Sequence, residues 1–300
     1  MMHSNSTRSR SNVAFRVLKF RAIFVLSTLS ACGPSDVVPQ AVKAARPIPL
    51  ESAEANQPEP RAVASPEPSS AAPIWAPRVV TWSALGIAFE GVTFDARSHR
   101  LRVVDQAGGP GSEFASALQA ARSKQGIVAV NAGFFTPEGE PLGLVVSRGR
   151  ARGHWNSATS LGSGLWYENE REISSIARRE TLGYSTARLM PELLQSGPML
   201  VESGRIVKGL HGGQPRPRTF IAWDGENRWW IGCAAPSSLH EMAAALVNST
   251  GAGFQIRDAL NLDGGRSSEL WVGSSVSGGP LTRRPLFNRK VRNYLVLVSR

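Results

Sequence analysis

The segment Asn261-Leu-Asp-Gly-Gly-Arg-Ser-Ser268 joins a short apolar strand, residues 259–262, to a glycine-rich turn that carries one acid and two hydroxyl groups. Glycine tolerates positive φ and lets a ligand approach the backbone closely. Successive backbone N–H groups in such a turn can form an anion-binding concavity. Because a polar residue at a strand end is held rigidly, Asp263 is a candidate functional carboxylate. An isolated Asp-Gly-Gly sequence also serves as a plain turn, so this alternative stays open.

Two further segments share this design, in which a buried strand meets a glycine-rich turn with polar groups. They are Val130-Asn-Ala-Gly-Phe-Phe135 and Leu194-Gln-Ser-Gly-Pro-Met199. Each turn alone is weak evidence, since most glycine-rich turns only reverse the chain. The combination of three is more specific than any one of them.

Two helices are predicted from their caps and apolar stripes. Ser238 and Glu241 form a capping box, and one apolar face follows it at helical spacing, made of Leu239, Met242, Ala243, Leu246 and Val247. An earlier helix is predicted from Ser112 as its N-cap to a stop at Gly126, with a face made of Phe114, Ala117, Leu118 and Ala121.

Most other patterned segments predict strands. Residues 86–95 and 101–105 alternate and predict a β-hairpin, and residues 220–223 and 229–231 predict a second one. Further strands are predicted at residues 127–130, 144–147, 164–167, 198–201, 205–207 and 293–298. Many strands with two or three helices between them predict an α+β domain, with mixed β-sheets and packed helices.

Four motifs occur in a fixed order: Asn131-Ala-Gly-Phe-Phe135, Gln195-Ser-Gly-Pro-Met-Leu-Val201, Pro217-Arg-Thr219 and the segment 261–268. Together with the helix from Ser238 and the closing residues 291–296, they resemble the phosphodiester glycosidase family. This domain is found in the enzyme that uncovers mannose 6-phosphate on lysosomal proteins. The resemblance covers residues 87–298, nearly the whole predicted domain. It implies hydrolysis of a sugar-1-phosphate diester, with cleavage between the anomeric carbon and the phosphate oxygen.

The resemblance also implies roles for residues of these motifs. Asn131, Arg218 and Asp263 match catalytic positions of the family motifs. We expect their motif neighbours to contact the substrate, namely Gln195, Ser196, Gly197, Thr219, Gly264, Gly265 and Ser267. The chain departs from the family at Arg266, where a small residue is common. A long basic side chain there would add a phosphate contact or narrow the pocket.

Physical chemistry fits these roles. An arginine binds a phosphodiester bidentately, so Arg218 would hold the phosphate. A carboxylate stabilises or attacks the oxocarbenium-like centre formed at the sugar, which suits Asp263. The alternatives are a structural ion pair for Arg218 and a turn cap for Asp263. A second carboxylate could activate water, but strand alternation would turn Glu269, the nearest one, away from Ser268.

No cofactor is expected, because the sequence shows no Cys/His zinc spacing and no dense carboxylate cluster. A divalent ion at Asp263 stays open as an alternative.

The N-terminal region predicts export. A basic stretch without acids, a short apolar run and the small residues before Cys32 are typical of a bacterial lipoprotein signal peptide over residues 1–31. The resemblance to such signals implies a lipid on Cys32, and acyl chains contribute about 0.8 kcal/mol per buried CH₂. Residues 32–77 predict a disordered linker, since half of the 20 prolines lie there. Residues 78–300 form the predicted single domain.

The formal net charge is +11, and many basic residues occur in short bursts such as Arg216 with Arg218. In an exported protein these favour an anionic glycan or glycolipid partner over nucleic acid. We therefore expect a glycosidase, lipid-anchored to the bacterial cell envelope and at the outer membrane if the cell has one. The alternatives are a non-catalytic lipoprotein that binds a phosphorylated glycan in the same pocket, and an envelope scaffold that uses its basic surface.

Overall fold

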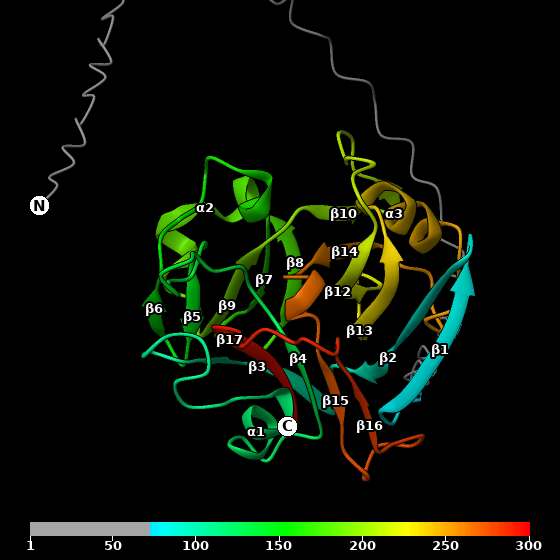
Figure 1. Ribbon diagram of the computed structural model, residues 1–300, viewed down its shortest axis with the longest axis horizontal. Helices are drawn as coiled ribbons and strands as arrows, with labels where there is room; N and C mark the ends of the chain where they lie inside the picture. The colour runs from blue at the N-terminus through cyan, green and yellow to red at the C-terminus, as the bar shows by residue number, and fades with distance from the viewer. Residues whose placement is uncertain (1–72) are drawn as a thin grey trace, which may run out of the picture. The chain divides into compact units, whose positions relative to one another are not determined.

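Three β-sheets surround a common apolar core in residues 73–300, the part of the chain that the computed structural model describes (Figure 1). The predicted signal peptide, Cys32 and nearly all of the predicted linker lie outside the described residues. Within residues 73–300 no helix is long and apolar enough to cross a membrane. The predicted α+β class is confirmed.

The first sheet has seven strands in the order β1-β2-β13-β12-β14-β10-β11. Their bounds are β1 (Arg78–Ala84), β2 (Ile87–Asp95), β13 (Arg228–Ser237), β12 (Arg216–Trp223), β14 (Asp258–Asn261), β10 (Met199–Glu202) and β11 (Arg205–Ile206). The second sheet, in the order β16-β15-β4-β17-β3, consists of β16 (Leu281–Arg283), β15 (Leu270–Val272), β4 (Val128–Asn131), β17 (Asn293–Ser299) and β3 (His99–Asp105). The third, in the order β6-β5-β9-β7-β8, consists of β6 (Arg150–Arg152), β5 (Val145–Ser147), β9 (Glu192–Ser196), β7 (Gly164–Glu168) and β8 (Ser174–Arg178).

Pairing within these described sheets is antiparallel throughout rather than mixed. Short turns join several sequential strands, and an antiparallel pair needs no helical crossover. The hairpin of β12 and β13 forms as predicted, with Phe220 opposite Gly232.

The other predicted hairpin is wrong, because β2 and β3 belong to different sheets. β2 pairs with β1 and β13, whereas β3 pairs with β17. The buried carboxylate of Asp95 accepts bonds from the backbone N–H and the guanidinium of Arg97, at 2.9 Å and 2.6 Å. These bonds turn the chain at the end of β2 and direct it into the second sheet.

The main core lies where the three sheets face each other. Ile221 and Ile231 contribute from the first sheet, Leu295 from the second, and Trp166 and Leu194 from the third. These side chains are fully or almost fully buried. At about 25 cal/mol per Å² of apolar surface removed from water, this shared core is the dominant attraction between the sheets.

Each sheet carries one helix on its outer face. Helix α3 (Leu239–Val247) packs on the first sheet, α1 (Ala117–Arg122) on the second and α2 (Arg179–Ala187) on the third. Two 3₁₀ turns are η1 (Ser160–Gly162) and η2 (Gly265–Ser267). The predicted capping box of Ser238 and Glu241 is present in full.

Helix α1 begins later than predicted, with Ser116 rather than Ser112 as its N-cap. The side-chain oxygen of Gln106 accepts bonds from the backbone N–H groups of Glu113 and Phe114, at 2.9 Å and 2.7 Å. These bonds hold residues 113–114 in a loop and delay the helix. Helix α2 was not predicted because its sequence has no continuous apolar stripe.

We predict that Leu295→Ala will lower the free energy of unfolding by about 2–5 kcal/mol, because it removes a fully buried side chain between sheets. Leu189→Ala is the matched control, since Leu189 is 69% exposed and should change stability by less than about 0.5 kcal/mol. Urea unfolding followed by tryptophan fluorescence measures both. Equal effects of the two substitutions would contradict this assignment of the core.

Candidate active site

The three glycine-rich turns are the connections that carry the chain from one sheet to another. The turn after Asn131 leads from β4 in the second sheet toward β5 in the third. The turn after Ser196 leads from β9 in the third sheet to β10 in the first. The segment 261–268 leads from β14 in the first sheet to β15 in the second. The three connections therefore lie where the sheets meet (Figure 1).

Asn131 joins two of the sheets through its side chain, which is fully buried. Its amide nitrogen donates to the carbonyl oxygen of Asp263 at 2.6 Å. Its carbonyl oxygen accepts from the Thr219 hydroxyl at 2.8 Å and from the Glu269 backbone N–H at 2.9 Å. Three of its polar contacts are thus made within the protein, which makes Asn131 a positioning residue for the Asp263 turn.

Asp263 is the carboxylate that this arrangement presents. Its backbone N–H donates to the carbonyl oxygen of Ala132 at 2.8 Å, so the turns after β4 and β14 lie side by side. Burial raises the pKa of Asp263 from 3.8 to about 6, and the Ser267 hydroxyl, the Gly264 backbone N–H and the charge of Arg289 only partly oppose this. A carboxyl group with a pKa near neutrality in a turn of this kind is typical of an active site.

Gly264 allows Arg218 to lie against the Asp263 turn. A side chain at Gly264 would meet the carbonyl oxygen of Pro217 at 2.8 Å and carbon atoms of Arg218 at 3.7 and 3.8 Å. The adjacent Gly265 has a positive φ of 61°, which favours glycine. Both glycines therefore act through the backbone, by allowing close approach.

Arg218 is half-buried and, within residues 73–300, has no carboxylate partner in an ion pair. Its Nε–H donates to the carbonyl oxygen of Ser237 at 3.1 Å. Burial, followed by the charge of Arg216, lowers the pKa of the Arg218 guanidinium. A partly desolvated guanidinium without an ion pair, next to the Asp263 turn, suits an anionic ligand. The alternative of a structural ion pair is not what the described residues show.

Arg289 is a site residue that the sequence did not single out, because 26 positions separate it from Asp263. Its guanidinium lies over the ring of Phe135 at 4.6 Å, and its charge acts on the Asp263 carboxyl group. Its backbone N–H donates to the carbonyl oxygen of Arg266 at 2.8 Å. Only tertiary structure brings this residue to the turn.

Arg266, the departure from the family pattern, is exposed and holds the same segment. Its Nε–H donates to the carbonyl oxygen of Phe287 at 3.0 Å. Arg266 thus fastens the loop that carries Arg289 through both its side chain and its backbone. This contact directs the guanidinium toward residues 287–289.

The predicted binding residues of the second turn are used inside the fold. The amide of Gln195 accepts from the backbone N–H groups of Leu144 and Asn156 and donates to the carbonyl oxygens of Asn156 and Gly162, each at 2.9 Å. All four of its bonding positions are filled, so the Gln195 side chain positions the turn rather than binding a substrate.

Ser196 and Gly197 have similar surroundings. The Ser196 hydroxyl is fully buried and donates to the carbonyl oxygen of Asn261 at 3.0 Å. A side chain at Gly197 would lie 2.2 Å from the carbonyl oxygen of Ser160, so only glycine fits there. The groups that act on the Asp263 carboxyl are Gly264, Ser267 and Arg289, and Arg218 lies against the neighbouring Gly264.

Glu269, which the sequence left unplaced, is buried on the other side of this turn. Its carboxylate accepts the Ala117 backbone N–H and lies 3.7 Å from the guanidinium of Arg284. Burial raises the pKa of Glu269. These contacts place the carboxylate beside the start of α1. Within residues 73–300 no three Cys, His, Asp or Glu side chains form a group suited to a metal ion.

The family of this chain follows from its similarity to known proteins. Residues 124–298 match the phosphodiester glycosidase family, and the chain belongs to that family. The predicted family is confirmed, and it defines the protein as a hydrolase of the phosphodiester glycosidase type. No curated protein sequence matches the chain significantly.

Among solved structures, the chain is similar to the catalytic domain of zebrafish N-acetylglucosamine-1-phosphodiester alpha-N-acetylglucosaminidase, which is described as auto-inhibited by its pro-peptide. The identity is 17%, the TM-score is 0.55, and the match covers 77% of this chain and 85% of that one. A hypothetical protein from Synechocystis is 20% identical over 75% of this chain and 61% of its own, with a TM-score of 0.48. The first likeness supports the fold, and the second carries no argument.

We predict that Asp263→Asn will stabilise the protein near pH 7, because it removes a buried charge. The folded carboxyl group has a pKa of about 6, above its ordinary 3.8, so the folded state binds the proton more tightly. Its contribution to stability is present below about pH 4 and is lost as the pH rises to about 6. The variant should therefore exceed wild type by on the order of 2 kcal/mol near pH 7 and match it near pH 4.

Urea unfolding at the two pH values measures this difference. Glu170→Gln is the control, since it removes the same charge from an exposed side chain. A variant that is less stable than wild type by the same amount at both pH values would show that hydrogen bonding to Ser267 outweighs burial.

Proposed function

We propose that this protein hydrolyses a sugar-1-phosphate diester in cell-envelope glycans or glycolipids. The observation that carries the proposal is that Asp263, a partly buried carboxyl group with a raised pKa, lies in a turn against which Arg218 packs at Gly264, and that Arg218 forms no ion pair within residues 73–300. A sugar-1-phosphate diester needs both groups at once, because a developing positive charge at the anomeric carbon lies next to an anionic phosphate.

In the proposed reaction the bond between the anomeric carbon and the phosphate oxygen breaks, and its electron pair leaves with the phosphate. Arg218 holds the phosphate and offsets the charge that builds on it. The Asp263 carboxylate stabilises or attacks the anomeric carbon, and water supplies the hydroxyl group of the released sugar. The products are a free sugar and a phosphomonoester.

A phosphate leaving group is weakly basic, so this reaction depends less on a general acid than ordinary glycoside hydrolysis does. The scheme therefore assigns Asp263 its ionised form. Arg289 assists by favouring that form, since its charge lowers the pKa of Asp263 against the larger effect of burial. The chain supplies all of these groups, so we propose that the reaction needs no cofactor. The alternative is that a divalent ion is required, and adding a chelator to the assay tests this.

We predict that Asp263→Asn and Arg218→Ala will each reduce kcat/KM by at least about a hundredfold, because each removes charge stabilisation from the transition state. The assay follows release of free GlcNAc from a GlcNAc-α-1-phosphodiester by NMR, with and without chelator. Arg205→Ala is the matched control, since this exposed arginine lies on β11 away from the turn and should leave kcat/KM within about twofold.

The pH profile tests the assigned protonation state. Wild-type kcat/KM should fall as the pH drops below about 6, following the pKa of Asp263. Full activity in both site variants would falsify the assignment. Saturable binding of the diester without release of sugar would instead favour a phosphorylated-glycan binding protein.

We also propose that the protein is exported and held at the envelope by a lipid on Cys32, and this rests on the N-terminal sequence pattern. Cys32→Ser should shift the protein from the membrane fraction to the soluble fraction, because the lipid attaches to the thiol. Ser30→Ala is the control, since it keeps a small residue before the cleavage site. Membrane association that is unchanged in Cys32→Ser would overturn the anchor.

A further inference from the structure

A mainly apolar pocket of about 670 Å³ lies beside the candidate active site. Its residues come from β1, β2 and β13 on one side, and from the segment that follows β16 on the other. Its volume is within the range of about 300–1,000 Å³ that is usual for small-ligand sites. The scheme proposed above leaves this pocket without a role.

Small side chains make the floor of this pocket. Ser83 pairs with Ala88 in neighbouring strands, and Thr81 and Cys233 both pair with Glu90, so these residues share one face of the sheet. Trp82 and Phe89 of the same strands stack on each other at 4.7 Å under α3, and they also contribute to the pocket lining. The floor is therefore low and open, which suits a thin apolar chain.

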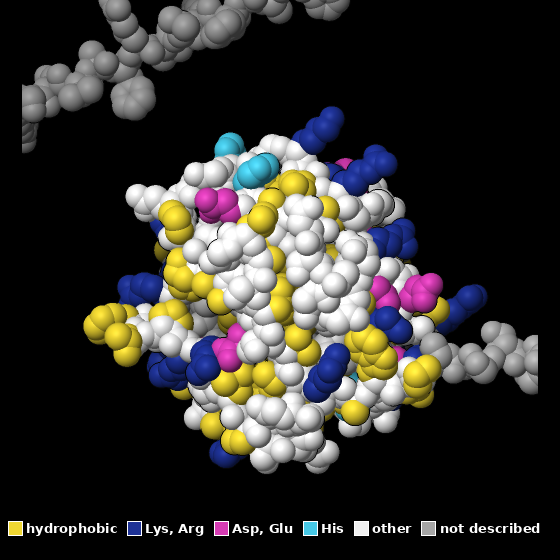
Figure 2. Space-filling view, turned by 90° about the vertical axis from the view of Figure 1, so that its right-hand side faces the viewer, with side chains coloured by type: hydrophobic (Ala, Val, Ile, Leu, Met, Phe, Trp, Pro, Cys, Tyr) yellow, Lys and Arg dark blue, Asp and Glu magenta, His cyan; other side chains and the backbone are white. Residues whose placement is uncertain are grey.

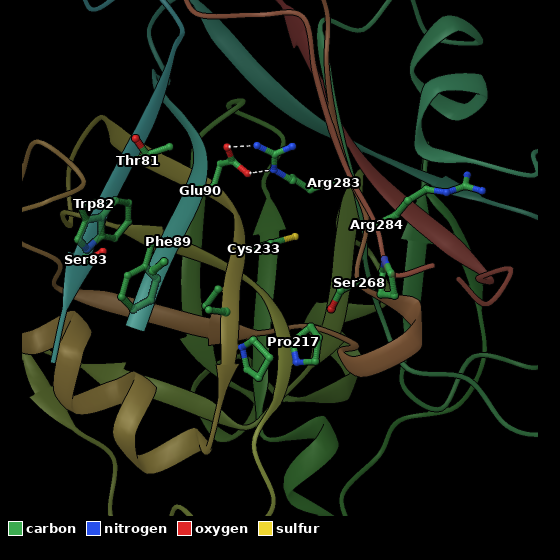
Figure 3. A pocket seen from close by; sticks show the side chains of 15 residues that line it. Thr81, Trp82, Ser83, Phe89, Glu90, Pro217, Cys233, Ser268, Arg283 and Arg284 are labelled. Carbon is green, nitrogen blue, oxygen red and sulfur yellow. Dashed lines mark hydrogen bonds and ion pairs between the residues drawn. The ribbon is translucent and has the colours of Figure 1, made fainter. Parts of the chain in front are cut away.

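The inner part of the pocket offers few charges to a ligand. Burial raises the pKa of the Cys233 thiol to about 12, so this group is neutral at physiological pH and acts as a small apolar surface. Ser268 is 3% exposed, and its buried hydroxyl has no hydrogen-bond partner among the described residues. In Figure 3 the Glu90–Arg283 ion pair closes the upper end, and Pro217 and Ser268 lie at the other.

Exposed apolar side chains belong to residues that are close in the sequence to residues of the pocket lining. Leu286 and Phe287 are the two residues after the lining residue Pro285, and they are 98% and 79% exposed. Leu85, in the turn between β1 and β2, is 67% exposed. The face that carries these two strands shows gathered hydrophobic side chains with basic side chains beside them (Figure 2). Such surface costs free energy in water and favours an apolar partner.

The pocket adjoins the catalytic turn at its inner end. Pro217 lines the pocket and precedes Arg218, while Ser268 lines it and follows Ser267. The Cys233 sulfur lies 3.8 Å from the Thr219 hydroxyl, which donates to Asn131, and Asn131 in turn bonds the Asp263 backbone. Pro217 and Ser268 thus connect the pocket to the two segments that carry Arg218 and Asp263.

This neighbourhood suits an amphiphile, with an apolar chain in the pocket and its phosphate and sugar at the adjoining segments that carry Arg218 and Asp263. Basic residues lie near this junction, since Arg284 lines the pocket and Arg216 lies close to Gly265 in the catalytic turn. Their charge complements a phosphate that joins an apolar part to a polar part.

We propose that the leaving group of the substrate is a long-chain alkyl phosphate, and that the pocket between β2 and Pro285 binds its hydrocarbon chain. This inference rests on the proposed function. Hydrolysis breaks the bond between the anomeric carbon and the phosphate oxygen, and water gives its hydroxyl group to the sugar and its proton to the phosphate. The products are a free sugar and an alkyl phosphate monoester, which keeps its chain in the pocket.

The test compares two GlcNAc-α-1-phosphodiesters, one with a methyl and one with a decyl group, below the concentration at which the decyl compound forms micelles. We expect wild-type kcat/KM to be at least about tenfold higher for the decyl ester, since each buried methylene adds about 0.8 kcal/mol. Ala88→Trp fills the floor and should bring the ratio of the two kcat/KM values close to one. Ala151→Trp is the matched control, because it adds the same side chain to exposed β6 and should keep the wild-type ratio.

The outcomes separate the two proposals. Equal rates on both esters in wild type overturn the pocket assignment and leave the glycosidase function intact. A decyl preference that survives Ala88→Trp also overturns it. If neither ester is hydrolysed, the proposed function fails, and the pocket assignment is then tested by binding alone, in titrations with decyl phosphate and with inorganic phosphate. The assignment requires that decyl phosphate binds more tightly than inorganic phosphate and that Ala88→Trp weakens its binding. Light scattering is the last check, because a wild-type dimer that Ala88→Trp dissociates would make this face a self-association surface and overturn the assignment.

Discussion

The buried amide of Asn131 is the interaction on which the site depends. One side chain bonds the carbonyl oxygen of Asp263, the hydroxyl of Thr219 and the backbone N–H of Glu269. These partners lie on the first sheet and on the connection from it to the second. Moving any of these segments would break one of these bonds, and an unsatisfied buried polar group costs about 1–3 kcal/mol. Asn131, which lies outside the Asp263 turn, therefore fixes the position of that turn.

That fixed position has a consequence for Asp263. A carboxyl group that burial moves to a pKa of about 6 opposes folding when it ionises, and a half-buried Arg218 without an acidic partner does the same. Neither group neutralises the other through an ion pair within the described residues. Unfavourable electrostatics of this kind are usual where a site is prepared for a charged ligand, and the apolar core of three sheets compensates for them.

The sheets and the pocket are related through the same strands. On one face of β12 and β13, Phe220 and Trp230 are buried under α3, and on the other face Ile221 and Ile231 belong to the main core. The end of this strand pair that carries Arg218 and Thr219 also contributes Pro217 and Cys233 to the pocket, together with residues of β2. A single sheet thus supports both the charged end and the apolar end of the proposed ligand. The loop that Arg266 fastens completes the opposite wall and also brings Arg289 to the carboxyl group.

The sequence by itself determined the α+β class, the capped helix α3, the hairpin of β12 and β13, and the family, because these depend on local periodicity, capping and short motifs. It also selected Asp263, which lies at a glycine-rich strand end, and Arg218, which matches a family motif. Only the tertiary structure decided that β2 and β3 separate into different sheets and that Gln195 is used inside the fold. Arg289 and the pocket likewise depend on contacts between residues far apart in the sequence, and long-range packing leaves no periodic signal that a single sequence can show.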